Sequence, residues 1–353
     1  MEKIRERSGF HDGHEDHLKP VKAVDLRQCK TTNDIIVQMK SSSFEARKIG
    51  EAADVLEEMF ADKDCYTVMT LSGALTMAKM GLIFSEMIER GWVDAIVSTG
   101  ALIAHGFIES SGMTHFKYEW DMDDKKLFEL GYDRVYDTLE LEKNFADASV
   151  LVDKIFGRQE YDGKNFGSWE LCEIIGKYLH ENVKGPSILK SAYEKKVPIY
   201  IPAINDSELG LDLLSLRSPS RFSKRPIVNI GHDALGDVLD FAKRVQNQKK
   251  MGIFTIGGGV PRNWAQQIGP FLELKYEISD PNKKLPRYRY GVRICPEPVS
   301  WGGLSGCTYS EGMSWGKFVP DGKYSEILVE ATAVLPFLVK ALMERFDAKE
   351  EKK

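Results

Sequence analysis

The sequence predicts an α/β protein in which a parallel β-sheet carries helices on both faces. Short apolar runs alternate with amphipathic stretches along most of the chain, and each apolar run ends in glycine or in a small polar turn. Strand, turn and helix repeated in this order are typical of a parallel sheet. A length of 353 residues with 42% hydrophobic composition is also enough for a sizeable core.

The first elements follow a polar extension that covers residues 1–40. A helix is predicted over residues 41–62, where apolar residues recur at helical spacing and the serines at 41–43 supply an N-cap. Residues 65–71 then form a strand, 72–78 a small-residue turn and 81–91 a helix. Residues 93–99 are a second apolar run, which Gly100 closes.

The second half repeats the pattern after a charged stretch, 116–185, which is predicted to be helical with few strands. Strands are predicted over 194–203, 225–231 and 251–256, and helices over 233–250 and 262–275. A long helix over 326–346 contains Pro336, which is expected to kink it. We therefore predict a single domain over residues 41–345 and a frayed tail over 346–353.

Charge and cysteine content exclude several classes of protein. The net charge of −5 does not indicate a nucleic-acid-binding surface, and no apolar run approaches the roughly 18 residues of a membrane span. The five cysteines form no C-x-x-C pair and the first residues are too polar for a signal peptide, so we expect a soluble cytoplasmic protein. His11, His14 and His17 read as a metal site or as a solvated tail. We favour the tail and predict no metal.

Three turns at strand ends are candidates for a nucleotide site. They are Ser72–Gly73–Ala74, Thr99–Gly100–Ala101 and the glycines 257–259. Glycine lets the backbone approach a phosphate, and the N-terminus of the following helix offers free amides. The alternative is a set of tight turns that need positive φ. Asp206, at another strand end, either holds ribose hydroxyls or caps the next helix.

The stretch "SEGMSWGKFVP" places Lys317 among small and aromatic residues. Burial lowers the pKa of a lysine, and a neutral lysine amine attacks a carbonyl or imine to form a Schiff base. Trp315 supplies a π-face for an aminoalkyl cation, and Glu311 a carboxylate for proton transfer. The alternative is a hairpin lysine whose ammonium group lies in water.

Five segments resemble the deoxyhypusine synthase family, in the order in which that family has them. "SEGMSWGK" resembles its E-A-V-S-W-G-K, and "VDAIVSTGA" its V-D-[VL]-x-V-T-T-A-G. "PAINDSELG" is similar to P-A-x-T-D-G-S-L-G, "GIFTIGGGVP" to I-I-L-G-G-G-V, and "EATAVLP" to D-A-S-[LI]-V-x-P. The segments extend from residue 66 to about residue 340.

The resemblance implies a Rossmann-like fold, bound NAD, polyamine substrates and a homotetramer with active sites at dimer interfaces. It makes Lys317 the imine-forming lysine, Trp315 the substrate-stacking residue and Glu311 a nearby carboxylate. The residues that it implies at NAD are Ser72, Gly73, Ala74, Thr99, Gly100, Ala101, Asp206, Gly258, Gly259, Glu330 and Ala331.

Several residues that hold the amine substrate in the family differ in this chain. Ala104, His105 and Gly106 stand where the family has acidic residues, and Asn263 stands where it has a histidine. Further family acids are replaced by Leu211, Trp301 and Leu304. Glu297 and Glu208 are candidate replacement carboxylates, and Trp301 a stacking surface for a guanidinium. His105 is either a proton shuttle or a structural histidine.

These residues lead to three hypotheses. The first is an NAD-dependent aminoalkyl transferase that makes a homospermidine-type product from putrescine, spermidine or agmatine. The second is a true deoxyhypusine synthase, which transfers the aminobutyl group of spermidine to a lysine of a translation factor. The third is a protein that binds NAD or a polyamine without turnover. The lost carboxylates favour the first over the second, and the retained Lys317, Trp315 and Glu311 weigh against the third.

Overall fold

The computed structural model describes residues 9–221 and 223–351. The first eight residues of the predicted extension and the last two of the predicted tail lie outside this range. Among the described helices, none combines the length and the hydropathy that a transmembrane segment requires.

A six-stranded parallel sheet forms the centre of the molecule, in the order β11-β10-β9-β1-β2-β7. Its strands are β1 (Cys65–Leu71), β2 (Ala95–Ser98), β7 (Ile199–Tyr200), β9 (Lys250–Ile256), β10 (Tyr288–Ile294) and β11 (Phe318–Ile327). The sheet confirms the predicted fold class. β10 and β11 were not foreseen in the sequence, and they extend the sheet beyond β9.

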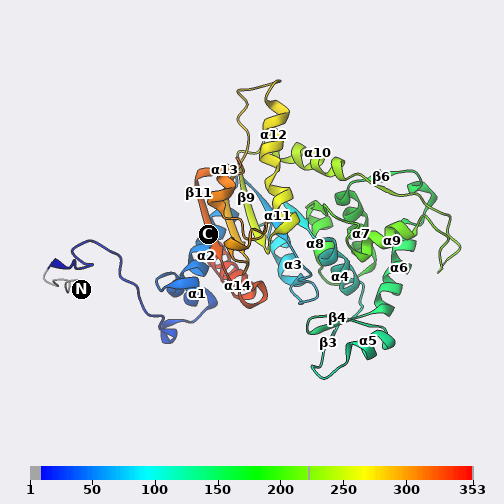
Figure 1. The fold of residues 1–353 in the computed structure, drawn as a ribbon, viewed down its shortest axis with the longest axis horizontal. Coiled ribbons are helices and arrows are strands. Elements are labelled where there is room, and N and C mark those ends of the chain that lie inside the picture. The colour runs from blue at the N-terminus through cyan, green and yellow to red at the C-terminus, as the bar shows by residue number, and fades with distance from the viewer. Residues whose placement is uncertain (1–8, 222, 352–353) are drawn as a thin grey trace, which may run out of the picture.

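Side chains that alternate along the strands enter two separate cores. On β1 and β9, Met69 and Phe254 pack into one core, while Val68 and Ile253 pack into the other. Helices α2 (Phe44–Ala61) and α14 (Ala331–Glu350) line the first core. Helices α10 (Ala234–Val245), α11 (Gly259–Gln266) and α12 (Ile268–Tyr276) line the second, on the other side of β9 (Figure 1). The helices therefore cover both faces, as predicted.

The remaining helices complete these two cores and a small separate cluster around Leu127. They are α1 (Thr32–Lys40), α3 (Gly81–Glu89), α4 (Gly100–Ser110), α5 (Asp124–Leu130), α6 (Glu142–Phe156), α7 (Ser168–Asn182), α8 (Ile188–Lys195), α9 (Glu208–Ser215) and α13 (Tyr309–Ser314). α1 forms inside the segment predicted to be a polar extension, with a capping box between Thr31 and Asp34. α14 runs to Glu350, past the start of the predicted frayed tail.

Two expectations about strands were wrong. The charged middle of the chain contains a three-stranded antiparallel sheet of β3 (Phe116–Lys117), β5 (Thr138–Leu141) and β4 (Tyr132–Val135). The strand predicted over 225–231 does not join the main sheet. Only β8 (Gly231–His232) forms there, and it pairs with β6 (Asn165–Phe166). The backbone of residues 223–230 bonds elsewhere: the amide of Asn229 donates to Oδ1 of Asp162 at 2.8 Å, and the amide of Val228 to the carbonyl of Leu216 at 3.0 Å.

Candidate functional site

Three of the predicted turns meet at the carboxyl edge of the sheet, because β9, β1 and β2 are neighbours there. The hydroxyl of Ser72, after β1, accepts a hydrogen bond of 3.1 Å from the amide of Gly258, after β9. The hydroxyl of Thr99, after β2, donates to the carbonyl of Gly73 at 2.6 Å. The sequence therefore placed these turns correctly beside one another.

Two glycines at these turns have open space where a Cβ would stand, as the close approach of a phosphate-bearing cofactor such as NAD requires. Gly73 has a φ of 69° and no atom within 4 Å of where a Cβ would stand. Gly259, with a φ of 60°, meets only the Ser305 hydroxyl at 4.0 Å, and it begins α11, whose first amides are free to donate to an anion. The space beside Gly257 is occupied instead, since a Cβ on this residue would stand 2.8 Å from the Cβ of Ser72.

The other predicted cofactor residues lie at the same edge. Asp206 follows β7 and is exposed, and the cap of α9 is its neighbour Ser207, which accepts from the amide of Gly210. This leaves the Asp206 carboxylate free of the capping role that the sequence also allowed. Glu330 follows β11 and caps α14 by accepting from the amides of Thr332 and Ala333.

Lys317 joins α13 to β11, and its ammonium group does not lie in water as it would in an exposed hairpin. The residue is only 9% exposed, and its Nζ donates to Oδ1 of Asn263 on α11 at 3.0 Å. Nζ also lies 5.8 Å from the centre of the Trp315 ring. Burial lowers the pKa of Lys317, and the Arg262 guanidinium adds to the effect, so the amine is easier to deprotonate than a surface lysine.

Two buried arginines hold the loop that carries Glu297, Trp301 and Leu304. Arg262 donates to the carbonyls of Leu304 and Cys307, at 3.2 and 2.7 Å. Arg293 donates to the carbonyl of Ser305 and pairs with a carboxylate on β11. Trp301, on this loop, is 74% exposed, and Trp315, next to Lys317 in the chain, is 65% exposed. Two large aromatic residues are thus largely open to solvent.

A second group of predicted residues lines an acidic cavity of about 500 Å³. Its walls are His105, Asp133, Val135, Glu140, Glu142, Phe145, Glu208, Leu211 and Asp212. Five of these side chains are carboxylates. Burial and the carboxylates of Asp153 and Glu208 raise the pKa of Asp212 to about 6. Oδ2 of Asp133 and Oε2 of Glu208 are buried without a hydrogen-bond partner. This excess of negative charge favours a cationic ligand with apolar methylene groups.

Three side chains with metal-ligand atoms meet at the wall of this cavity: His105, His115 and Glu140. Oε2 of Glu140 lies 3.1 Å from Nδ1 of His105 and 2.6 Å from Nε2 of His115. The three come from α4, from the segment before β3 and from β5. In the sequence, a metal had been considered only at His11, His14 and His17. These lie in the extension, where His11 contacts Asp16 at 3.0 Å.

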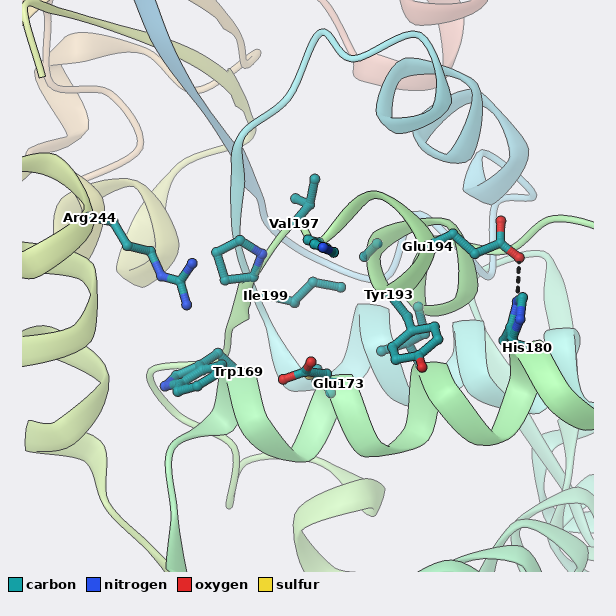
Figure 2. A pocket seen from close by; sticks show the side chains of 13 residues that line it. Trp169, Glu173, His180, Tyr193, Glu194, Val197, Ile199 and Arg244 are labelled. Carbon is teal, nitrogen blue, oxygen red and sulfur yellow. Dashed lines mark hydrogen bonds and ion pairs between the residues drawn. The ribbon is translucent and has the colours of Figure 1, made fainter.

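Another cavity, of about 530 Å³, lies between α7, α8 and α10 (Figure 2). It contains none of the predicted site residues. Glu194 and His180 pair at its rim at 2.8 Å, and the Arg244 guanidinium lies 5.2 Å from the centre of the Trp169 ring. Its charged groups are of both signs, unlike those of the acidic cavity.

Within one chain, the lysine and the acidic cavity are far apart. Figure 1 shows α13 and β11, which flank Lys317, on the left of the main body, and α6, α9 and β4, which line the cavity, on its right. An amine held in the cavity therefore does not reach Lys317 of the same chain.

Only His105 and Glu208, among the polar residues of the cavity, were predicted from the sequence. Asp133, Glu140, Glu142 and Asp212 were missed. One signal was available, because Glu208 and Asp212 are four residues apart and share a face of α9. The other missed acids belong to the antiparallel sheet and to the start of α6, which the sequence did not reveal.

Comparisons with known proteins identify a family for most of the chain. A family model described as deoxyhypusine synthase matches residues 34–342. A relative from Archaeoglobus fulgidus, named probable deoxyhypusine synthase 2, is 36% identical over 307 residues, which are 86% of this chain and 96% of the relative. A relative from Chlorobaculum parvum, named deoxyhypusine synthase-like protein, is 33% identical over 91% of this chain and 88% of the relative.

A solved structure, described as that of a putative deoxyhypusine synthase from Entamoeba histolytica, has the same fold. It superposes with a TM-score of 0.58 at 16% identity and covers 91% of this chain and 96% of its own.

Proposed function

Because the chain belongs to the deoxyhypusine synthase family, a family of aminobutyl transferases, we propose that it is an NAD-dependent aminoalkyl transferase of polyamine metabolism. It transfers an aminobutyl or guanidinobutyl group from putrescine, spermidine or agmatine to a second amine and makes a homospermidine-type product. The observation that carries this proposal is Lys317, a buried lysine with a lowered pKa that contacts Asn263 and Trp315.

Lys317 acts as the nucleophile that holds the four-carbon group. Its neutral amine attacks the carbon of the donor imine, the donor nitrogen leaves as an amine, and a lysine imine remains. Asn263 accepts a hydrogen bond from Nζ and so directs it, while the face of Trp315 lies against the cationic end of the group. Bound NAD supplies the hydride chemistry of the reaction, at the turns that contain Ser72, Thr99 and Gly258.

The amine site is completed by a second copy of the chain. The acidic cavity supplies carboxylates where family acids have been replaced by His105 and Leu211. Since the cavity is far from Lys317 of its own chain, it faces Lys317 of a neighbour, as in a homotetramer with interface active sites. Glu297 and Trp301, on the loop that Arg262 and Arg293 hold, are suited to a guanidinium, which stacks on a ring and pairs with a carboxylate.

The first experiment is mass spectrometry of the protein with NAD and putrescine, agmatine or spermidine, quenched with borohydride. We expect a reduced adduct on Lys317 and a small-molecule conjugate in solution. Lys317→Ala should remove the adduct and lower product formation by at least about a thousandfold. Lys323→Ala, an exposed lysine on β11 that pairs with Glu58, is the matched control and should do neither. Unchanged product formation by Lys317→Ala would falsify the mechanism.

The names of the relatives favour a second candidate, a true deoxyhypusine synthase. In that case mass is added to a lysine of the translation factor and no small conjugate forms. The same experiment separates the two when the factor is included. Either activity is consistent with a cytoplasmic protein, which the five unpaired cysteines support.

A further inference from the structure

His105 is the only nitrogen base among the nine side chains that line the acidic cavity. It lies on α4, and the residue is 5% exposed. Its Nδ1 is 3.1 Å from Oε2 of Glu140. Its other ring nitrogen, Nε2, has no hydrogen bond with any described residue. The ring is thus fixed on one side and free on the other.

Glu140 determines which nitrogen of His105 carries the proton. Burial raises the pKa of Glu140, but the hydrogen bonds from His105, His115, Asn144 and the Leu141 amide outweigh it and hold the pKa far below its usual value. Glu140 is therefore ionised and can only accept. Nδ1 of His105 must donate to it, so that the lone pair of the neutral ring is on Nε2.

Lys79 fixes the tautomer of His115 in the same way and weighs against a metal. The ammonium Nζ of Lys79 lies 2.7 Å from Nδ1 of His115 and only donates, so Nδ1 accepts and Nε2 donates to Glu140. Both lone pairs that a cation would need, on Nδ1 of His105 and Nε2 of His115, are thereby replaced by N–H groups. The cluster is a hydrogen-bonded support for His105.

We propose that His105 is the general base that deprotonates the acceptor amine in the acidic cavity, oriented by Glu140 and His115. This inference rests on the proposed function. An alkylammonium has a pKa near that of lysine, about 10.4, so it enters the cavity protonated. The carboxylates that attract the cation also stabilise its charged form, which cannot attack. A base beside it resolves this conflict.

The proton balance of the step is simple. Nε2 of His105 takes a proton from the ammonium group, which becomes a neutral amine, and the imidazolium is stabilised by Glu140. The amine lone pair then forms a bond to the imine carbon on Lys317 of the neighbouring chain. The bond from that carbon to Nζ breaks, and the double bond passes to the acceptor nitrogen, which keeps one proton as a protonated imine. Nζ takes two protons, one returned by His105 and one from the acceptor nitrogen, and leaves as the lysine amine, so no further acid is required. Return of the hydride that bound NAD would hold reduces the new imine to the conjugate.

The test separates the donor half of the reaction from transfer to the acceptor. The variant is His105→Asn, whose amide N–H replaces Nδ1–H at Glu140 but which has no basic nitrogen. The matched control is His180→Asn, whose histidine also pairs with a carboxylate, Glu194, but in the other cavity (Figure 2). The donor half is followed as reduced nicotinamide absorbance and as the borohydride adduct on Lys317, and transfer as the conjugate released.

We expect His105→Asn to lower the transfer rate by about 10²- to 10⁴-fold and to keep the adduct within about twofold. Its transfer rate should rise with pH toward about 10.4, where the amine loses its proton unaided, and the difference from the wild type should shrink over that range. Asp133, Glu142, Glu208 and Asp212 face the amine in both proteins, so they affect both profiles alike. His180→Asn should match the wild type.

Three results overturn the inference. If His105→Asn and wild type transfer at equal rates, with a normal adduct in both, the role of His105 is wrong but the proposed function stands. One bound metal ion per chain in the purified protein contradicts the assigned tautomers. A wild-type protein that forms neither adduct nor reduced nicotinamide removes the proposed function, and the role of His105 with it. Thermal unfolding of each variant shows whether a lost activity is instead lost folding.

Discussion

The pKa values of individual side chains in this molecule depend on burial and on whether a hydrogen-bond partner offsets it. Lys317 is buried beside Asn263, so its amine is easier to deprotonate. Glu140 is equally buried, but several donors keep it ionised. Asp212 has one hydrogen-bond donor, the Ser149 hydroxyl. This single bond does not offset burial and the neighbouring carboxylates, so the pKa of Asp212 is raised.

The raised pKa of Asp212 predicts a pH-dependent cost in stability. Its pKa is about 6 in the folded protein, against 3.8 for an unperturbed aspartate, so the folded chain retains the proton over a range in which the unfolded chain has lost it. The contribution to stability is complete below pH 3.8 and lost as pH rises through 6. Asp212→Asn should therefore be more stable than wild type by about 1–2 kcal/mol at pH 7.5 and by much less at pH 4.

Urea unfolding at both pH values measures this difference. The matched control is Asp147→Asn on α6, an exposed carboxylate paired with Lys143, which should leave the pH dependence as it is. A difference between Asp212→Asn and wild type that is the same at pH 4 and pH 7.5 would contradict the prediction.

At the scale of the elements, the turn after β9 joins three strands into one site. Gly257 has a φ of 80° and lies against Ser72, whose hydroxyl bonds to Gly258. Both the backbone angle and the close approach require glycine. The local conformation and the contact between strands thus depend on the same residue.

Gly257→Ala is expected to lower the free energy of unfolding by about 2–3 kcal/mol and to weaken NAD binding. Gly91→Ala is the matched control, since Gly91 has a φ of 70° but no atom within 4 Å of its Cβ position. It should cost only the backbone strain, about 1 kcal/mol, and leave NAD binding unchanged. Chemical unfolding and calorimetric titration with NAD give the two quantities. Equal costs for the two variants would show that the contact with Ser72 is unimportant.

At the scale of the whole molecule, several large apolar side chains before Lys317, on the loop 299–304 and at the start of α11 are exposed. Trp301 is 74% exposed and Trp315 65%, and Val260, Val299 and Leu304 are each about half exposed. Exposed apolar surface of this kind in a soluble protein commonly marks an interface. The separation of Lys317 from the acidic cavity within one chain gives the same indication.

We predict that the protein is larger in solution than one chain of 39.9 kDa and that Trp301→Glu reduces its size and its transfer activity. The charge would be buried without a partner in an interface that the ring fills. Ile278→Glu, in the exposed turn that follows α12, is the control and should keep the wild-type size. Light scattering after size exclusion measures the mass. A wild-type mass of 39.9 kDa, or a Trp301→Glu variant of unchanged size, would contradict the interface.

The sequence by itself determined the parallel α/β core and the turns at the strand ends, and it led to the prediction of a reactive role for Lys317. These depend on local patterns: apolar runs of strand length, glycines after them and a lysine within "SWGK". The spacing of apolar residues and the residue types that form turns depend on only a few neighbouring positions, so both can be recognised in the sequence before the fold is known. The short strands of the antiparallel sheet, such as β3 with two residues, carry no such signal.

Only the tertiary structure decided the composition of the acidic cavity and the contacts of His105. The cavity joins residues from α4, β4, β5, α6 and α9, which are more than one hundred positions apart in sequence at the extremes. The choice between a structural histidine and a proton shuttle depends on Glu140, which lies 35 residues away and 3.1 Å from the ring. Hydrogen bonding and electrostatic interaction depend on distance in space, and the fold sets that distance.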